Sequence, residues 1–187
     1  MSNDAQLLIS NQVGYPETQW DAKTKEDYVN LPILESEYTV PIFWLALFGP
    51  KNIERYIDPE DEFDMPYLAA SVSDAKARFE RNLSELRKVF KNVDSFLPEW
   101  QKILDGIKKK YIKVELHQIL EMTEDGYGLL EPALRFLDNP DEESSLAFMR
   151  LTAFPDVFDQ ESQSILDRTL ESGRKTSDYL FGFDPWQ

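Results

Sequence analysis

The fold prediction starts from residues 72–93, which read VSDAKARFERNLSELRKVFKNV. Apolar side chains recur in this stretch every three or four residues, which is the spacing of one face of an α-helix. Ser73 is a candidate N-cap, and lysine and arginine gather late in the stretch, where they complement the helix dipole. The pattern predicts an amphipathic helix of about six turns. Its apolar stripe consists of Val72, Ala75, Phe79, Leu83, Leu86, Phe90 and Val93.

Further helices are expected on both sides of this stretch. A second amphipathic helix, carrying Trp100 and Leu104, is expected to end at the lysines 108–110, and the short connection favours an antiparallel helical hairpin. Residues 41–48 are apolar on nearly all sides and are followed by Gly49-Pro50, which predicts a short buried helix. Three more helices are predicted after residue 128, over residues 129–137, 142–152 and 160–171.

Strand signals are fewer. Residues 111–117 alternate apolar and polar side chains, and residues 5–12 read as a short strand or an extended arm. Residues 14–30 are expected to form a loop anchored by Tyr15, Trp20 and Tyr28, while the aromatic C-terminal residues 179–186 are expected to fold back onto the body. We therefore predict one domain over residues 1–187, mostly α with a minor β component (α+β). We expect a helical bundle around a central antiparallel helix hairpin, with a short strand pair.

The composition excludes several classes of function. The chain has 187 residues, with 35 acidic and 20 basic side chains, a net charge of -15, one histidine and no cysteine. Disulfides, thiolate metal sites and cysteine nucleophiles are therefore impossible, and a multi-histidine zinc site has almost no ligands to use. Residues 73–113 form a basic segment between two acidic ones. The net negative charge repels free nucleic acid and attracts basic proteins.

The sequence also bears on the compartment. No stretch approaches the 18 or so consecutive apolar residues that a membrane-spanning helix needs, and the N-terminus lacks the basic start and apolar run of a secretory signal. We expect a cytoplasmic protein with no membrane partner; its oligomeric state is left open.

The candidate site is an acidic cluster after the short buried helix. The cluster does not fit a calcium-binding EF-hand loop that starts at Asp58, because the sixth position is Phe63 and the twelfth is Ala69. It is either a solvated loop or a docking surface for a cationic partner, and neighbouring aromatic side chains favour docking. The residues of this candidate partner-binding site are Tyr56, Asp58, Glu60, Asp61, Glu62, Phe63 and Asp64.

No catalytic motif accompanies the cluster. The sequence has no G-x-S-x-G, no H-E-x-x-H and no glycine-rich phosphate loop. His117 lies near Glu115 and Glu121 but has no evident nucleophile, so we interpret it as a partly buried histidine bonded to a neighbour. We predict no catalytic residues, no metal and no cofactor.

The N-terminal half suggests a family. The loop with Trp20, the segment Tyr38-Thr-Val-Pro41-Ile-Phe-Trp44-Leu-Ala-Leu-Phe48 and the long helix after it resemble small acidic bacterial immunity proteins of polymorphic toxin systems. The resemblance implies a non-enzymatic cytoplasmic protein that neutralises a cognate, basic toxin by direct binding. Two alternatives stay open: a scaffold or self-associating assembly protein, and a carboxylate- or metal-dependent hydrolase.

Overall fold

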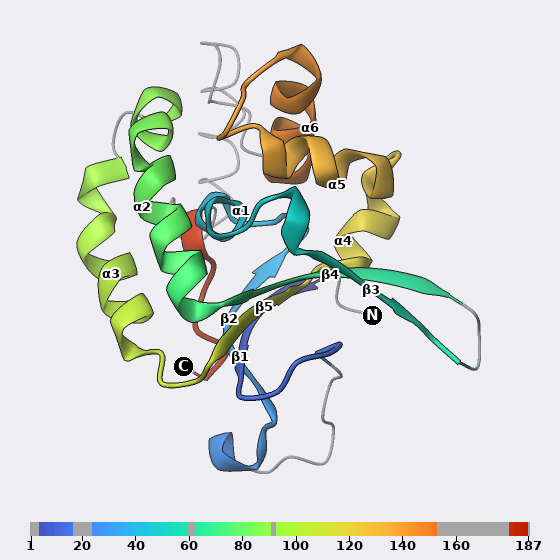
Figure 1. Ribbon diagram of the computed structural model, residues 1–187, viewed down its shortest axis with the longest axis vertical. Coiled ribbons are helices and arrows are strands. Elements are labelled where there is room, and N and C mark those ends of the chain that lie inside the picture. Colours follow the sequence, from blue (N-terminus) through green and yellow to red (C-terminus); the bar gives the residue numbers. More distant parts are fainter. Residues whose placement is uncertain (1–3, 17–23, 60–62, 91–92, 153–179, 187) are drawn as a thin grey trace.

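The computed structural model describes residues 4–16, 24–59, 63–90, 93–152 and 180–186. In this structure a five-stranded antiparallel sheet carries a layer of helices on one face (Figure 1). The predicted helical bundle around a helix hairpin is therefore wrong, because the sheet is a major component of the fold. The predicted helix over residues 160–171 and the predicted anchor Trp20 lie outside the described residues.

Three of the five strands were not predicted. The strands are β1 Asp4–Ser10, β2 Asn30–Glu37, β3 Ile53–Ile57, β4 Asp64–Ser71 and β5 Tyr111–Glu115, in the order β2-β1-β5-β4-β3. β1 and β5 fall on the two predicted strands and pair with each other, as expected. Of the other three, β2 and β4 each pair with a strand distant in sequence, which local patterns do not report. β3 pairs only with β4, its neighbour along the chain, but its segment is polar and acidic and lacks a strand-like alternation.

Strand β4 contains a proline, Pro66. It is tolerated there because it lies opposite Arg55, while the pairing of β4 with β5 begins only at Tyr67. A proline at such a position removes no hydrogen bond that the ladder needs.

The described helices are α1 Ile42–Leu47, α2 Val72–Val89, α3 Leu97–Gly106, α4 His117–Met122, α5 Gly126–Arg135 and α6 Glu142–Thr152. Five of the six fall on predicted helices, whereas α4 begins at His117, the last residue of the segment predicted as a strand. The N-cap of α2 is Ser71 and not Ser73, because Ser71 has an extended backbone and its hydroxyl accepts the Asp74 N–H. α2 ends at Val89, and the last stripe residue, Val93, is buried in a short 3₁₀ turn that follows.

The predicted hairpin of α2 and α3 lies at one end of the helical layer (Figure 1). Phe79 of α2 and Trp100 of α3 pack with their ring centroids 5.8 Å apart, and both rings contact Phe43 of α1. All six residues of α1 are buried, as predicted, so α1 forms the centre of the core in place of the hairpin.

The C-terminal segment folds back onto the body, as predicted. Leu180 and Phe181 are buried, and the Trp44 indole N–H donates to the Phe181 carbonyl at 3.0 Å. Residue Phe183 forms an isolated antiparallel bridge with Glu35 of β2. The segment therefore lies along the outer side of the β2 edge.

The face of the sheet opposite the helices is polar but partly covered. The described parts of the loop between β1 and β2 lie on this side in Figure 1. Lys113 of β5 faces this way, is 1% exposed, and donates through Nζ to Asn30 Oδ1 at 2.9 Å. Tyr15 stacks on Tyr56 with centroids 4.6 Å apart. The loop thus shields polar groups that would otherwise face solvent.

Candidate functional site

The candidate site lies on the β3–β4 hairpin, which extends beyond the helical layer (Figure 1). The turn is closed by the Asp58 N–H, which donates to the Phe63 carbonyl at 2.9 Å. Of the predicted site residues, Tyr56, Asp58, Phe63 and Asp64 lie on this hairpin. The other three, Glu60, Asp61 and Glu62, fall outside the described residues. A hydrogen-bonded hairpin carries the described part of the cluster. The choice between a solvated loop and a docking surface stays a prediction.

Two of the predicted site residues pack within the chain. The Tyr56 ring stacks on Tyr15, which also meets Tyr67 edge to face at 5.5 Å. The Arg55 guanidinium pairs with Asp64 across the hairpin, where both groups are well exposed. Tyr56 therefore helps to hold the loop after β1 against the sheet, and Asp64 is not a bare charge.

Phe63 links the hairpin tip to the helical layer. Its ring meets the His117 imidazole edge to face, with centroids 4.9 Å apart, and its side chain remains 39% exposed. On the other side of the tip, Ile57 is 64% exposed. The tip therefore combines acidic and apolar exposed side chains, and the Phe63 contact orients it.

His117 lies in a polar cluster at the start of α4. Its Nδ1 is 2.8 Å from the Tyr127 hydroxyl, and its Nε2 is 3.6 Å from Glu121 Oε1. Burial lowers the pKa of His117, and burial raises the pKa of Tyr127 to about 12, assisted by nearby carboxylates. The phenol therefore stays protonated and shares a hydrogen bond with the ring. This arrangement confirms the interpretation of His117 as a partly buried, bonded histidine.

A row of polar side chains crosses all five strands on the face opposite the helices. Aligned cross-strand pairs place Glu35, Gln6, Glu115, Tyr67 and Glu54 side by side, from β2 to β3. Glu35 Oε1 accepts from the Gln6 amide at 2.7 Å. Burial raises the pKa of Glu35, and it raises the pKa of Glu115 to about 7. This row was not predicted, because its members come from five different strands whose register only the folded sheet sets.

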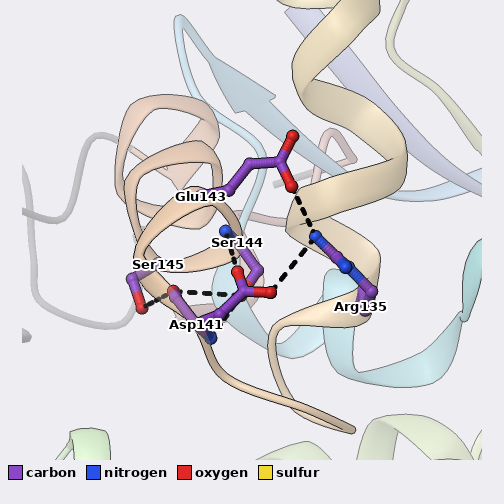
Figure 2. A network of polar contacts seen from close by, with 5 residues as sticks. All are labelled: Arg135, Asp141, Glu143, Ser144 and Ser145. Carbon is purple, nitrogen blue, oxygen red and sulfur yellow. Dashed lines mark hydrogen bonds and ion pairs between the residues drawn. The ribbon is translucent and has the colours of Figure 1, made fainter.

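A pocket of about 420 Å³ opens beside the β3 edge, between β3, β4 and α5. Arg135 borders it and is held by Glu143, at 2.7 Å, and by Asp141, at 3.4 Å (Figure 2). Asp141 and Ser144 exchange backbone-to-side-chain hydrogen bonds at the start of α6, and the Ser144 N–H holds the pKa of Asp141 below its usual range. The lining residues are Ile53, Arg55, Pro66, Tyr127, Gly128, Leu130, Glu131, Pro132, Arg135 and Glu143.

The pocket was not predicted, because its walls come from two segments more than sixty residues apart in sequence. Within the described ranges, no three histidine or carboxylate side chains are placed to hold a metal ion. The helices described here include none that is both long enough and apolar enough to cross a bilayer.

Comparison with known proteins gives no relative. No protein-family model matches the chain, and neither the curated proteins nor the solved structures contain a significant match. The resemblance to immunity proteins therefore stays a prediction.

Proposed function

We propose that the protein is a non-enzymatic binding protein that docks a basic protein partner at its β3–β4 hairpin. In the form that the sequence resemblance suggests, it is an immunity protein that neutralises a cognate toxin in the cytoplasm. The observation that carries the proposal is the projecting acidic hairpin with exposed Ile57 and Phe63 side chains at its tip. Apolar anchors within a charged rim are the usual make-up of a protein-binding surface.

The charge of the chain also supports docking of a basic partner. The hairpin region, residues 51–66, holds six carboxylates and two basic side chains, within a chain of net charge -15. Such a surface accelerates association with a cationic partner and orients it during approach. Because exposed charges are screened by salt, the association rate is expected to carry the electrostatic signature.

The C-terminal aromatic residues do not favour the scaffold alternative. Trp186 donates its indole N–H to the Pro32 carbonyl at 2.8 Å and meets Tyr28 edge to face. This ring is thus used within its own chain. Trp186 remains 39% exposed, so only its uncovered surface is open to a second copy while these contacts hold.

The test is identification of the partner followed by kinetics. The tagged full-length chain is used to capture proteins from its source cells, and the captured protein is then purified. We expect a basic protein whose association rate falls by about tenfold or more between about 0.05 and 0.5 M salt. A partner that is acidic, or a rate that does not change with salt, contradicts the proposal.

Matched charge variants locate the contact. Glu54→Gln with Asp58→Asn removes two negative charges from the hairpin, and Glu80→Gln with Glu99→Gln removes two exposed ones from α2 and α3. The hairpin pair is expected to slow association several-fold more than the helix pair, because nearby charges steer most strongly. Equal effects of the two pairs would place the contact elsewhere.

A further inference from the structure

The two edges of the sheet differ in what lies beyond them. β2 is covered on its outer side by the C-terminal segment, through paired hydrogen bonds of 2.8 and 2.9 Å between Glu35 and Phe183. β3 pairs with β4 on one side, and no other described strand pairs with it. An uncovered edge strand offers unpaired backbone groups to another chain.

The hairpin closure fixes which backbone groups of β3 point outward. The Asp58–Phe63 pair is hydrogen-bonded, and in an antiparallel ladder bonded and non-bonded pairs alternate. The pairs formed by Tyr56 and Glu54 are therefore bonded to β4, whereas Ile53, Arg55 and Ile57 turn their N–H and C=O groups outward. The position of Pro66, which has no N–H, opposite Arg55 agrees with this alternation.

Most of these outward groups are available to a partner strand. The Ile53 N–H is already bonded to the Pro50 carbonyl. The Arg55 side chain is 63% exposed and Ile57 is 64% exposed, so neither is covered by the helical layer. The open edge therefore presents the N–H and C=O groups of Arg55 and Ile57 together with the Ile53 carbonyl.

The pocket beside this edge indicates what side chain a partner strand would carry. Ile53 and Arg55 form its wall on the β3 side, so a strand added to β3 would project alternate side chains toward it. Arg55 and Arg135 are each paired with carboxylates, whereas Glu131 is exposed and has no hydrogen-bond or ion-pair partner among the described residues. A lysine or arginine side chain would supply the ion-pair partner that Glu131 lacks among the described residues.

We propose that the outer edge of β3 is the docking strand for an extended basic segment of the protein partner. The segment continues the sheet beyond β3, bonds to the Arg55 and Ile57 backbone, and places a basic side chain in the pocket beside Glu131. This inference depends on the proposed function, since it names the part of the hairpin that is bound. A second copy of this chain is the less suitable occupant, because each copy carries a net charge of -15.

Amide hydrogen exchange on the ¹⁵N-labelled full-length protein tests the proposal. The probe is a capped peptide of alternating lysine and valine, about eight residues long, which is sufficient to span β3. At saturation the Arg55 and Ile57 amides are expected to exchange about tenfold more slowly, while the Glu54 and Tyr56 amides, already bonded to β4, change little. The matching peptide of glutamate and valine controls for charge and is expected not to bind.

Two substitutions at one position separate the backbone from the side chain. Arg55→Pro and Arg55→Ala both remove the ion pair with Asp64, but only Arg55→Pro removes the outward N–H. We expect Arg55→Pro to weaken binding of the lysine–valine peptide by about tenfold relative to Arg55→Ala, the cost of about one hydrogen bond. Circular dichroism checks that both variants fold, and the exchange measurement on the unmodified chain stands if one does not.

Each other outcome overturns the edge proposal in a recognisable way. If the peptide binds but protects amides away from Arg55 and Ile57, the edge is not the docking site, although the acidic binding function stands. If the peptide does not bind, edge docking of basic segments is wrong, while partner capture still tests the function independently. If those amides are protected without peptide and a dimer forms, a second copy occupies the edge.

Discussion

The two edge strands of the sheet, β2 and β3, both carry backbone groups that have no partner strand within the sheet, and the chain treats them differently. At the β2 edge, Gly182 adopts a positive φ of +78° that brings the C-terminal segment against Glu35, and Trp186 bonds to the Pro32 carbonyl. At the β3 edge, Arg55 and Ile57 have exposed side chains, a pocket lies nearby, and among the described strands only β4 pairs with β3.

The two edges are protected against unwanted pairing in different ways. Unpaired strand edges promote aggregation, and proteins usually cover or charge them. This chain uses its own C-terminus to cover β2 and surrounds β3 with carboxylates. The charged, uncovered edge is thus the one suited to a specific partner, and changes at each edge should have different consequences.

The largest loss of stability is expected from adding a side chain at Gly182, where the C-terminal segment contacts β2. A Cβ at Gly182 would collide with the Glu35 backbone oxygen, in a backbone conformation that already disfavours a side chain. We expect Gly182→Ala to lower the free energy of unfolding by about 3 kcal/mol, measured by urea denaturation. Gly14→Ala is the control: its φ is +95° but no atom lies near the added Cβ, so about 1 kcal/mol is expected. Equal losses would show that the β2 edge contact contributes nothing beyond backbone strain.

A medium effect is expected between the edges, at Glu115. Its folded pKa of about 7 lies above the ordinary value of 4.5, so the folded state binds the proton more tightly and stability falls as pH rises from about 4.5 to 7. Glu115→Gln removes this penalty. We expect its stability relative to the unmodified protein to increase by about 2 kcal/mol between pH 5 and pH 8, by urea denaturation.

The exposed end of the same polar row supplies the control. Glu54 lies at the open edge with its side chain in solvent. Glu54→Gln is expected to change stability by less than about 0.5 kcal/mol at both pH values. A pH-dependent gain at Glu54 equal to that at Glu115 would mean that burial in the middle of the sheet is not the cause.

The smallest effect is expected at the open edge itself. Arg55→Ala removes an exposed ion pair with Asp64, and such pairs contribute little to folding. The free energy of unfolding is expected to change by less than about 0.5 kcal/mol, measured in the same urea titrations. A loss above about 2 kcal/mol would indicate that the β3 edge is maintained for stability, like the β2 edge.

The helices were largely predictable because their information is local. The apolar stripe from Val72 onward gave α2 almost to its last turn, and the apolar run before Gly49 gave α1. The helix over 142–152 was predicted with the bounds that the structure has. The errors lay at the ends of helices. The N-cap of α2, for example, is Ser71 and not Ser73, because Ser71 has the extended backbone that a cap needs.

The acidic and aromatic composition of the candidate site could be taken from the sequence, but its placement on a hairpin could not. Tyr56, Asp58, Phe63 and Asp64 do lie together, yet Tyr56 and Phe63 partly serve contacts with Tyr15 and His117. Each of those contacts joins segments more than about 40 residues apart in sequence. The spacing of residues within the acidic cluster therefore could not predict them.

The net negative charge and the amphipathic helices follow from the amino-acid sequence, because they depend on residue type or on neighbours a few positions away. The aromatic composition of the C-terminus indicated that it would fold back, but not onto which strand. The tertiary contacts were needed to show that the helices cover a five-stranded sheet and that residues near Phe183 close its β2 edge. They also showed that β3 lies beside a pocket and that no second described strand pairs with it. Most strand pairs of this sheet join segments distant in sequence, so their register exists only in the folded chain. The register in turn decides which backbone groups are left to face a partner.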